Sequence, residues 1–419
     1  MRVAKPQLYF GTMLKSLVSA AIVLPLGLAA NFVMHLVVAR ALPEAGYGIF
    51  SFAISLSSVL ALGAALGTSV SMMRYLGPLI DSRRLHEANG LISSTRKLIA
   101  FSASFVAICM FSLSNNNSDL QGGLYWASLL LLPFTLDLWR ESCMRGLHKT
   151  VSAISPRQLL LPIVMCIIIT AAGLRTEWEV MAAFFVSLCL VTIAAFIHMH
   201  FATSHIREYC AEDVGYGWLR TSVPMGIASL ALLGICRWDL VILGAFVNMD
   251  QVGLYAAAAR LSLLAAVVLR IVNLVVAPFL AQAYHAGRLV DFRRLLKIST
   301  IGAALVGSPL FFGIVIWSEE LLALFGHGYV GATLELRILA LGQYINLLTG
   351  PVSFALTMSR HERANMLLNI LAAAVSLIGL LILVPLLGSV GAAIATTLAL
   401  SCLNISQLAL CTYLFKVRR

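Results

Sequence analysis

Long apolar runs, separated by short polar stretches, recur along the whole chain. Most are about twenty residues long, which is the length that an α-helix needs to cross the hydrocarbon core of a bilayer. A transmembrane β-barrel would instead show alternating segments of about ten residues. The pattern therefore predicts twelve transmembrane helices, at residues 15–39, 46–72, 97–114, 122–139, 157–174, 179–199, 219–245, 252–279, 298–317, 333–357, 364–385 and 388–415.

Composition supports the membrane assignment. Hydrophobic residues make up 60% of the chain and charged residues 11%, whereas a soluble domain carries about 25% charged residues. A soluble fold of this length cannot bury so large an apolar fraction, because surface-to-volume scaling limits the share of its surface that folding can bury. The first apolar run starts near Leu17 and is too long for a signal-peptide core, so we expect it to be retained. The predicted fold class is an all-α integral membrane protein.

The basic residues indicate the orientation of the chain. Of the 29 Lys and Arg residues, 23 fall at the termini and in the loops on one predicted side, four fall on the other side, and two fall inside the eighth span. The positive-inside rule places the richer side in the cytoplasm. We therefore expect both termini in the cytoplasm of a bacterial cell, a multi-pass protein of the cytoplasmic (inner) membrane, and an even number of spans. Ten or fourteen spans remain open, because charges interrupt the seventh span. The net charge of +11 follows from this loop pattern and does not indicate a nucleic-acid partner.

No extramembrane domain or catalytic motif is evident. The longest loops hold about 20 to 25 residues, too few to fold alone. The chain lacks a GxxxxGK[ST] loop, which argues against direct ATP hydrolysis. Its His and Cys residues show no metal-ligand spacing, and no nucleophile–base arrangement stands out. We expect neither a metal, a cofactor nor an enzyme activity.

Two stretches suggest an internal repeat. PEAGYGIFSFAISLSSVLALG begins at Pro43, and MDQVGLYAAAARLSLLAAVVL begins at Met249. Each enters a helix through a Gly close to a Tyr, and we align Gly46 with Gly253. Since many transporters are built from repeats, this predicts a six-plus-six arrangement.

Several segments, in order along the chain, resemble the polysaccharide-export branch of the multidrug/oligosaccharidyl-lipid/polysaccharide (MOP) flippase superfamily. They are ARALPEAGYGIFSFAISL, RGLHKTVSAISPRQLLLP, RWDLVILGAFVNMDQVGLYAAAARL, LLALFGHGYVGATLELRILALGQYINLLTGP with MSRHE, and GSVGAAIATTLAL. The resemblance implies two six-helix bundles, here residues 1–210 and 211–419, related by a pseudo-twofold axis around a central cavity. It also implies alternating access, a lipid-linked oligosaccharide as cargo, contact with membrane lipids, and polysaccharide polymerase or export proteins as partners.

An undecaprenyl-type pyrophosphate carrying a glycan has an anionic head that crosses lipid slowly, because its charges must leave water. Such a cargo favours intramembrane basic residues, and Arg260 and Arg270 in the eighth span fit. Arg suits phosphate because of its planar fork of donors. The alternatives are an ion pair of Arg260 with Asp239, and snorkelling of Arg270 to the interface.

Two acids are candidates for coupling or gating. Arg237 and Asp239 interrupt the seventh span, so these charges must form an ion pair or contact water. Asp239 can serve either as a gate or H⁺/Na⁺ coupling site, or as part of an interhelical ion pair. Arg237 is also a cavity candidate. Asp137 is three residues from Arg140, where a local ion pair is the favoured interpretation.

Two further features concern the lining and the motion of the bundle. Asn31 and His35 share a face of the first span and either line the cavity or bridge helices. Gly350 and Pro351 are hinge candidates, since Pro kinks a helix.

Three other functions compete with a flippase for lipid-linked oligosaccharide. A multidrug or metabolite cation antiporter shares the architecture, but it should prefer intramembrane acids over Arg260 and Arg270. A lipid II flippase usually has fourteen spans. An enzyme acting on polyprenyl-linked sugars, such as a ligase or polymerase, usually needs a large external loop, and none is predicted here.

Overall fold

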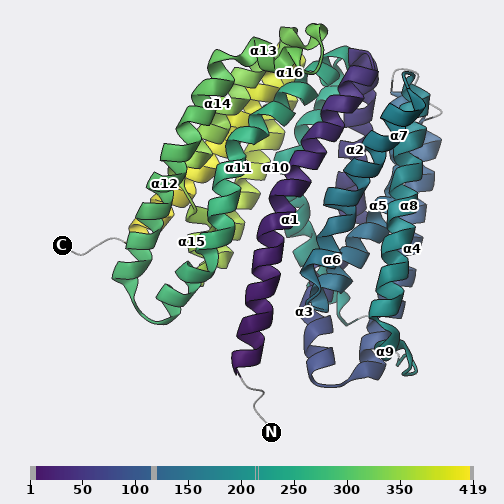
Figure 1. Cartoon of the computed structure of the whole chain (residues 1–419), viewed down its shortest axis with the longest axis vertical. Coiled ribbons are helices and arrows are strands. Elements are labelled where there is room, and N and C mark those ends of the chain that lie inside the picture. Colours follow the sequence, from purple (N-terminus) through teal and green to yellow (C-terminus); the bar gives the residue numbers. More distant parts are fainter. Residues whose placement is uncertain (1–5, 115–119, 213, 216, 416–419) are drawn as a thin grey trace. The chain divides into compact units, whose positions relative to one another are not determined.

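The computed structural model describes the backbone of residues 6–114, 120–212, 214–215 and 217–415 (Figure 1). It describes the side chains of the same residues except 6–22, 70, 221, 228, 231–236, 274 and 278. The described part is helical and contains no strand. The all-α prediction is confirmed, while residues 1–5 and 416–419, which carry terminal charges used to orient the chain, lie outside the described residues.

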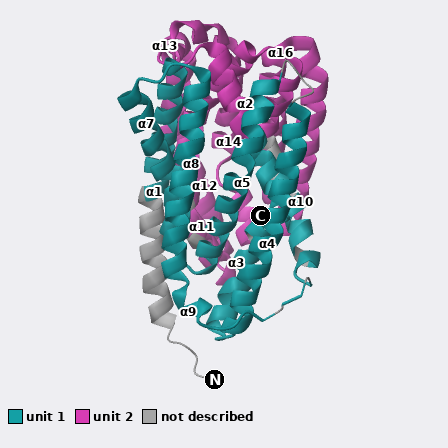
Figure 2. Ribbon diagram, turned by 90° about the vertical axis from the view of Figure 1, so that its right-hand side faces the viewer, with its two compact units in different colours: residues 1–41, 56–230 teal, residues 42–55, 231–419 magenta. Residues whose placement is uncertain are grey.

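The helices form two compact units, shown in different colours in Figure 2. Unit 1 comprises residues 1–41 and 56–230, and unit 2 comprises residues 42–55 and 231–419. The predicted division into residues 1–210 and 211–419 stays a prediction. Unit 1 contains α1 (Pro6–Ala41), α3 (Thr68–Asp81), α4 (Leu85–Ser114), α5 (Gln121–Gly146), α6 (Thr150–Ser155), the π-helical turn η1 (Pro156–Leu160), α7 (Leu161–Ala172), α8 (Glu177–Ala202) and α9 (Ser204–Arg207).

Two helices contribute residues to both units, and the remaining elements belong to unit 2. The shared helices are α2 (Glu44–Ala64) and α10 (Leu219–Phe246). Unit 2 also contains α11 (Met249–His285), α12 (Leu289–Ile316), α13 (Ser318–Ala323), the 3₁₀ turn η2 (His327–Ala332), α14 (Thr333–Thr349), α15 (Val352–Met358) and α16 (Glu362–Leu414).

In the part of the chain that is described, eight helices are long and apolar enough to cross a membrane, or nine if a bent pair is counted as one span. The protein is therefore a multi-pass membrane protein. α16 runs for 53 residues, but Gly388 within it has a non-helical backbone (φ 59°, ψ −133°). At 1.5 Å per residue a 53-residue helix would measure about 80 Å, more than twice a bilayer core. The two spans predicted at 364–385 and 388–415 thus correspond to the two parts of α16, while the total of twelve stays a prediction.

Several predicted boundaries differ from the structure. The span predicted at 46–72 is broken between α2 and α3, where Leu66 (φ 49°) and Gly67 (φ 75°) are left-handed. Gly67 lies against the carbonyl of Ser222 in α10, with no room for a Cβ atom. The helices predicted at 97–114 and 298–317 begin twelve and nine residues earlier, at Leu85 and Leu289. Apolar periodicity cannot reveal such polar helix extensions, because they lie beyond the lipid.

Local sequence explains several helix ends. α7 ends at Gly173, which takes a left-handed conformation (φ 61°) open to glycine. α8 begins with a capping box: the Thr176 hydroxyl accepts a bond from the Glu179 amide, and the Glu179 carboxylate accepts one from the Thr176 amide. These reciprocal bonds satisfy two amides that the helix itself leaves unpaired.

The internal repeat appears as matching turns in the two units. The α3–α4 turn in unit 1 and the α11–α12 turn in unit 2 each contain a left-handed residue, Arg83 (φ 58°) and Gly287 (φ 70°). The amide of the next residue, Arg84 or Arg288, donates to the carbonyl five residues earlier at 2.9 Å. Both arginines then pair with an acid three residues later, Glu87 and Asp291 respectively.

The first repeated segments pack against each other within unit 2. A Cβ atom on Gly48 would collide with the carbonyl of Met249 and approach the amide of Gly253. A Cβ atom on Gly253 would meet Glu44 and Gly48 in the reciprocal way. Gly48, and not Gly46, is therefore the counterpart of Gly253, because only backbone contact reveals which of two nearby glycines needs to lack a side chain.

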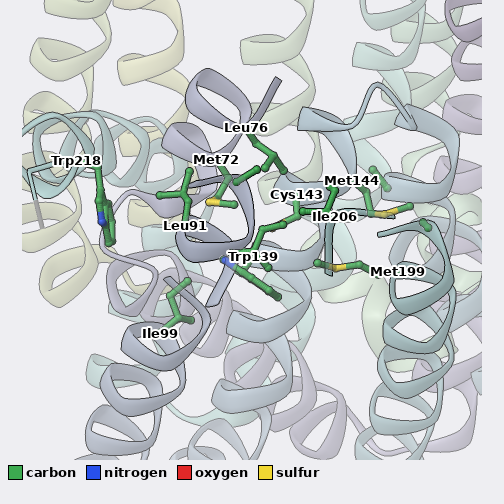
Figure 3. Close-up of a cluster of buried hydrophobic side chains, with 14 of the residues drawn as sticks. Met72, Leu76, Leu91, Ile99, Trp139, Cys143, Met144, Met199, Ile206 and Trp218 are labelled. Atoms are coloured by element: carbon green, nitrogen blue, oxygen red, sulfur yellow. The ribbon is translucent and has the colours of Figure 1, made fainter. Parts of the chain in front are cut away.

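The core of unit 1 lies between α3, α4, α5 and α8 and is drawn in Figure 3. Met72, Leu76 and Cys143 are fully buried there. The indole N–H of Trp139 donates to the Thr95 hydroxyl at 3.0 Å, so the one polar atom of this large buried side chain is satisfied. This packing fixes α5, which carries Asp137 and Arg140.

Candidate functional site

Asp239 is the centre of a buried polar cluster in unit 2. It lies in α10 and is 6% exposed. Its carboxylate accepts bonds from the Leu240 amide and from the Tyr255 hydroxyl, both at 2.8 Å. The Tyr255 hydroxyl also lies 3.5 Å from the hydroxyl of Thr396 in α16. The buried carboxyl thus accepts bonds from neutral donors of two helices, α10 and α11, and a residue of α16 contacts the second donor.

A second acid, Glu335 in α14, lies in the same region and is also 6% exposed. Its carboxylate accepts a bond from the Ser389 hydroxyl at 2.6 Å, and its charge acts on Tyr255. The sequence did not predict that Asp239 and Glu335 lie in one cluster, because the helices that form the cluster are far apart along the chain. These helices are α10, α11, α14 and α16.

Arg260 completes the cluster. It lies in α11, is half-buried, and acts on Asp239 through its charge and on the Tyr47 hydroxyl through charge and hydrogen bonding. Among the residues that the structure describes, Arg260 forms no ion pair, so the expected alternative of a pair with Asp239 is not formed. Its guanidinium thus keeps donors for another partner.

Tyr47 in α2 holds its position by packing and is fully buried. Its ring meets Tyr329 edge-on with a centroid distance of 5.8 Å and lies 6.3 Å from the ring of Phe325. The neighbouring Gly48 permits the backbone of α2 to touch that of α11, which brings Tyr47 beside Arg260. Tyr47 was not among the candidate residues predicted from the sequence. Its place directly before Gly48, the glycine of the internal repeat, could have indicated it.

The other predicted residues have different surroundings. Arg237 is half-buried and also acts on Asp239 through its charge. Arg270, ten residues after Arg260 in α11, is exposed. Asn31 is half-buried and His35 is buried, both in α1 of unit 1. Their role in a cavity stays a prediction.

Gly350 and Pro351 separate α14 from α15, and the chain bends there by 45°. Gly350 has φ 72° and lies against the side chain of Thr300, so no other residue fits without strain. The predicted kink is present, while a hinge motion stays a prediction.

Asp137 and Arg140 form the predicted local ion pair in α5, at 2.8 Å and almost completely buried. The guanidinium of Arg140 also donates to the carbonyls of Ser152 (3.2 Å) and Ala153 (2.9 Å) in α6. All three of its nitrogens are therefore used: Nε bonds to Asp137 in the same helix, and the two terminal nitrogens join α5 to α6. This geometry gives Arg140 a structural role and neutralises Asp137.

In the described ranges no three His, Cys, Asp or Glu side chains gather into a group that could hold a metal ion. The cluster in unit 2 instead offers two carboxylates, hydroxyl groups and a guanidinium. It can hold a proton or a small cation at the acids, and an anionic oxygen at Arg260.

Comparisons with known proteins identify the family and the fold. The model of the family described as "Polysaccharide biosynthesis protein" matches residues 14–284, more than half of the chain. The chain is similar to the "Probable flippase AglR" of Haloferax volcanii, at 26% identity over 189 residues, which are 44% of this chain and 38% of that protein. The match thus spans less than half of the relative's length.

Solved structures share the fold. An inward-facing multidrug resistance MATE family transporter of the MOP superfamily has a TM-score of 0.69 at 15% identity, over 92% of this chain and 94% of that one. A MOP superfamily transporter from Pyrococcus furiosus, described as having a binding pocket of reverse polarity, has a TM-score of 0.65 at 14% identity, over 96% and 95%. The predicted resemblance to the polysaccharide branch of this superfamily is confirmed. The chain belongs to the polysaccharide biosynthesis protein family and has the fold of the MOP superfamily transporters.

Proposed function

We propose that the protein is a flippase that translocates an undecaprenyl-pyrophosphate-linked oligosaccharide across the bacterial cytoplasmic membrane for surface polysaccharide or O-antigen synthesis. Membership of the polysaccharide biosynthesis family supports this class of cargo. The probable flippase of Haloferax volcanii supports translocation as the activity. In this proposal the protein is a transporter and not an enzyme, and it works by alternating access.

One observation carries the cargo assignment. Arg260 is an arginine within a candidate membrane span that makes no ion pair among the described residues. Charged side chains inside a membrane are rare and mark substrate or ion paths. The Arg260 fork suits a phosphate oxygen, and we assign it to the pyrophosphate head of the cargo in a cationic cavity.

Asp239 is the coupling residue in this proposal. Its surroundings of hydroxyl and amide donors suit either a protonated carboxyl or a carboxylate beside a small cation such as Na⁺. The cargo phosphate would compete with the Asp239 carboxylate for the positive charge of Arg260, which provides a way to link cargo and ion. Asp137 is less suited to coupling, because Arg140 neutralises it.

The experiment is deletion of the gene in its host, followed by complementation. Loss of surface polysaccharide, with lipid-linked repeat units accumulating on the cytoplasmic side, would support the proposal. Arg260→Ala should abolish complementation and Arg260→Lys should restore part of it, because Lys keeps the charge but not the fork. Arg175→Gln, at an exposed loop residue, is the matched control. Full complementation by Arg260→Ala at normal protein level would remove the cationic site from the proposal.

A cation antiporter for drugs or metabolites is the second candidate, because two buried acids, Asp239 and Glu335, lie in one cluster. Multidrug transporters are also among the proteins that share the fold. Normal surface glycan with altered dye resistance in the deletion strain would favour it. Reporter fusions at each terminus would test the proposed cytoplasmic location of both ends, and co-purification would test polymerase or export proteins as partners.

A further inference from the structure

A π-helical turn in unit 1 places an arginine inside a membrane span. α6, η1 and α7 together form a candidate span of 23 residues, Thr150–Ala172. In the π-turn the Leu161 amide donates to the carbonyl of Pro156. Such turns cost stability and often occur at functional sites. Arg157 belongs to this turn and is the eighth residue of the span, about 10 Å from its start at 1.5 Å per residue.

The guanidinium of Arg157 is held by an aromatic ring. Its central carbon lies 4.7 Å from the ring centroid of Phe134 in α5, and Phe134 is only 2% exposed. Stacking on a ring orients the plane of the guanidinium and leaves its N–H edge available. Arg157 itself is half-buried.

Arg157 is also the uncompensated charge of its surroundings. Within the described residues it forms no ion pair. Asp137, one turn after Phe134 in α5, is already paired with Arg140 at 2.8 Å. The two arginines therefore differ in their partners. The guanidinium of Arg140 is fully hydrogen-bonded within the α5–α6 hairpin and its charge is balanced by Asp137, whereas Arg157 adds one net positive charge.

The other side of the π-turn is closed by α1. A Cβ atom on Gly27 would lie 3.0 Å from the Cβ atom of Gln158, so the helices touch there without space for a ligand. Arg157, the preceding residue, is on the α5 side of the turn, over Phe134. An oriented guanidinium that forms no ion pair among the described residues, in a helix of a candidate membrane span, is expected to face water or an anion, since an isolated charge in lipid is costly.

We propose that Arg157, stacked on Phe134, binds the phosphate ester of a polyprenyl-linked cargo while the cargo is bound to unit 1. This inference rests on the proposed function and adds a second phosphate-binding residue to it, in the other unit from Arg260. A phosphate on a lipid tail fits better than a free phosphate, because the arginine belongs to a candidate membrane span and stacks on a buried aromatic ring.

Binding of farnesyl pyrophosphate to the purified full chain in detergent tests the proposal directly. Arg157→Gln should raise the Kd for this probe at least about tenfold, since a charge-assisted bond to phosphate is lost, and Arg157→Lys should raise it less. Arg175→Gln removes a charge from an exposed loop of the same unit and should leave the Kd unchanged. Equal Kd values for the wild type and Arg157→Gln, or no binding of the probe to the wild type, would overturn the proposal.

Competition distinguishes the possible sources of phosphate. Neither phosphatidylglycerol nor inorganic pyrophosphate should displace the probe as well as unlabelled farnesyl pyrophosphate does. Equal displacement by the first would identify a site for bulk lipid, and equal displacement by the second a site for free phosphate; either result overturns the proposal.

A second variant guards against misfolding of Arg157→Gln. Phe134→Leu leaves the charge in place and removes the aromatic platform, so it should raise the Kd by a smaller factor, and an unchanged Kd would count against the stacking role. The proposed function fails separately, if deletion of the gene leaves surface polysaccharide intact while Arg157-dependent binding persists.

Discussion

In the helical hairpins α5–α6 of unit 1 and α15–α16 of unit 2, a buried polar side chain bonds one helix to the other. The side chain is charged in unit 1 and neutral in unit 2. Each hairpin has a left-handed residue at its turn, His148 (φ 58°) and Arg360 (φ 65°). In unit 1 a buried arginine, Arg140, crosses from α5 to two carbonyls of α6. In unit 2 a buried amide, Asn365, crosses from α16 to Ser353 of α15.

The bonds of Asn365 form a neutral network. Its amide nitrogen donates to the hydroxyls of Ser353 and Thr357, each at 3.1 Å. Its amide oxygen accepts a bond from Gln407 at 2.8 Å. Arg157 and Asn369 each stand nine residues after the left-handed residue of the turn, His148 or Arg360. Asn369 donates to the carbonyl of Asn365 within its own helix. The buried bonds that join the hairpin of unit 1 therefore involve charged groups, and those of the hairpin in unit 2 are neutral.

This difference separates two uses of charge in a membrane. Arg140 with Asp137 is a closed pair that stabilises the hairpin, and the network of Asn365 does this without charge. Arg157 is not needed to close the hairpin, and Arg260 is not paired with Asp239. Charged side chains that are not needed to hold helices together, such as Arg157 and Arg260, are available to bind a cargo.

The largest expected effect is the loss of Arg140. Arg140→Met leaves Asp137 as a buried, uncompensated acid and removes two bonds to α6, so we expect a loss of about 3–5 kcal/mol in unfolding free energy. Unfolding of the purified chain in detergent measures it. The double variant with Asp137→Leu should recover part of the loss, and Lys149→Met, at an exposed residue, is the control. A loss no larger than that of the control would contradict the closed pair.

The neutral hairpin should be less sensitive. Asn365→Leu removes the bonds to Ser353, Thr357 and Gln407 and leaves polar groups unsatisfied, for an expected loss of about 1–3 kcal/mol. The same unfolding measurement applies, with Asn369→Leu as the matched control. If Asn365→Leu cost more than Arg140→Met, charge would not be what distinguishes the two hairpins.

The acid of unit 2 depends on a hydroxyl rather than an arginine. Tyr255→Phe removes one donor from Asp239 but leaves the Leu240 amide, so the expected loss is about 1–2 kcal/mol. Transport, measured as complementation of the deletion strain, should fall more than stability does. Unchanged transport would show that Tyr255 only packs.

The smallest effect is expected at the repeated surface turns. Glu87→Gln and Asp291→Asn each remove the acid of a turn pair whose arginine is about 60% exposed, so each should change stability by about 0–1 kcal/mol. Both effects should shrink further in high salt. A marked difference between the two variants would show that the repeated turns are not equivalent.

Much of the architecture was predictable, because the bilayer forces apolar runs into helices. The predicted spans overlap the helices of the structure, with breaks at 65–67 and 350–351, and the kink at Gly350–Pro351 follows from proline chemistry. The repeat was also visible, but its register was not, since Gly46 and Gly48 look alike until their neighbours are known. The break at Gly67 was missed for the same reason: a close approach to α10 decides it.

The sequence by itself determined a helical membrane protein, its family resemblance, and the arginines and acids that lie within apolar stretches. These follow from local composition and from residues a few positions apart. Only the tertiary structure decided which charged side chains form ion pairs and which form none among the described residues. Arg140 became structural, Asp239 was joined to Tyr255 and Arg260, and Arg157 moved from a predicted helix boundary into a span. The physical reason is that pairing within a low-dielectric interior depends on contacts between distant helices, which no local pattern records.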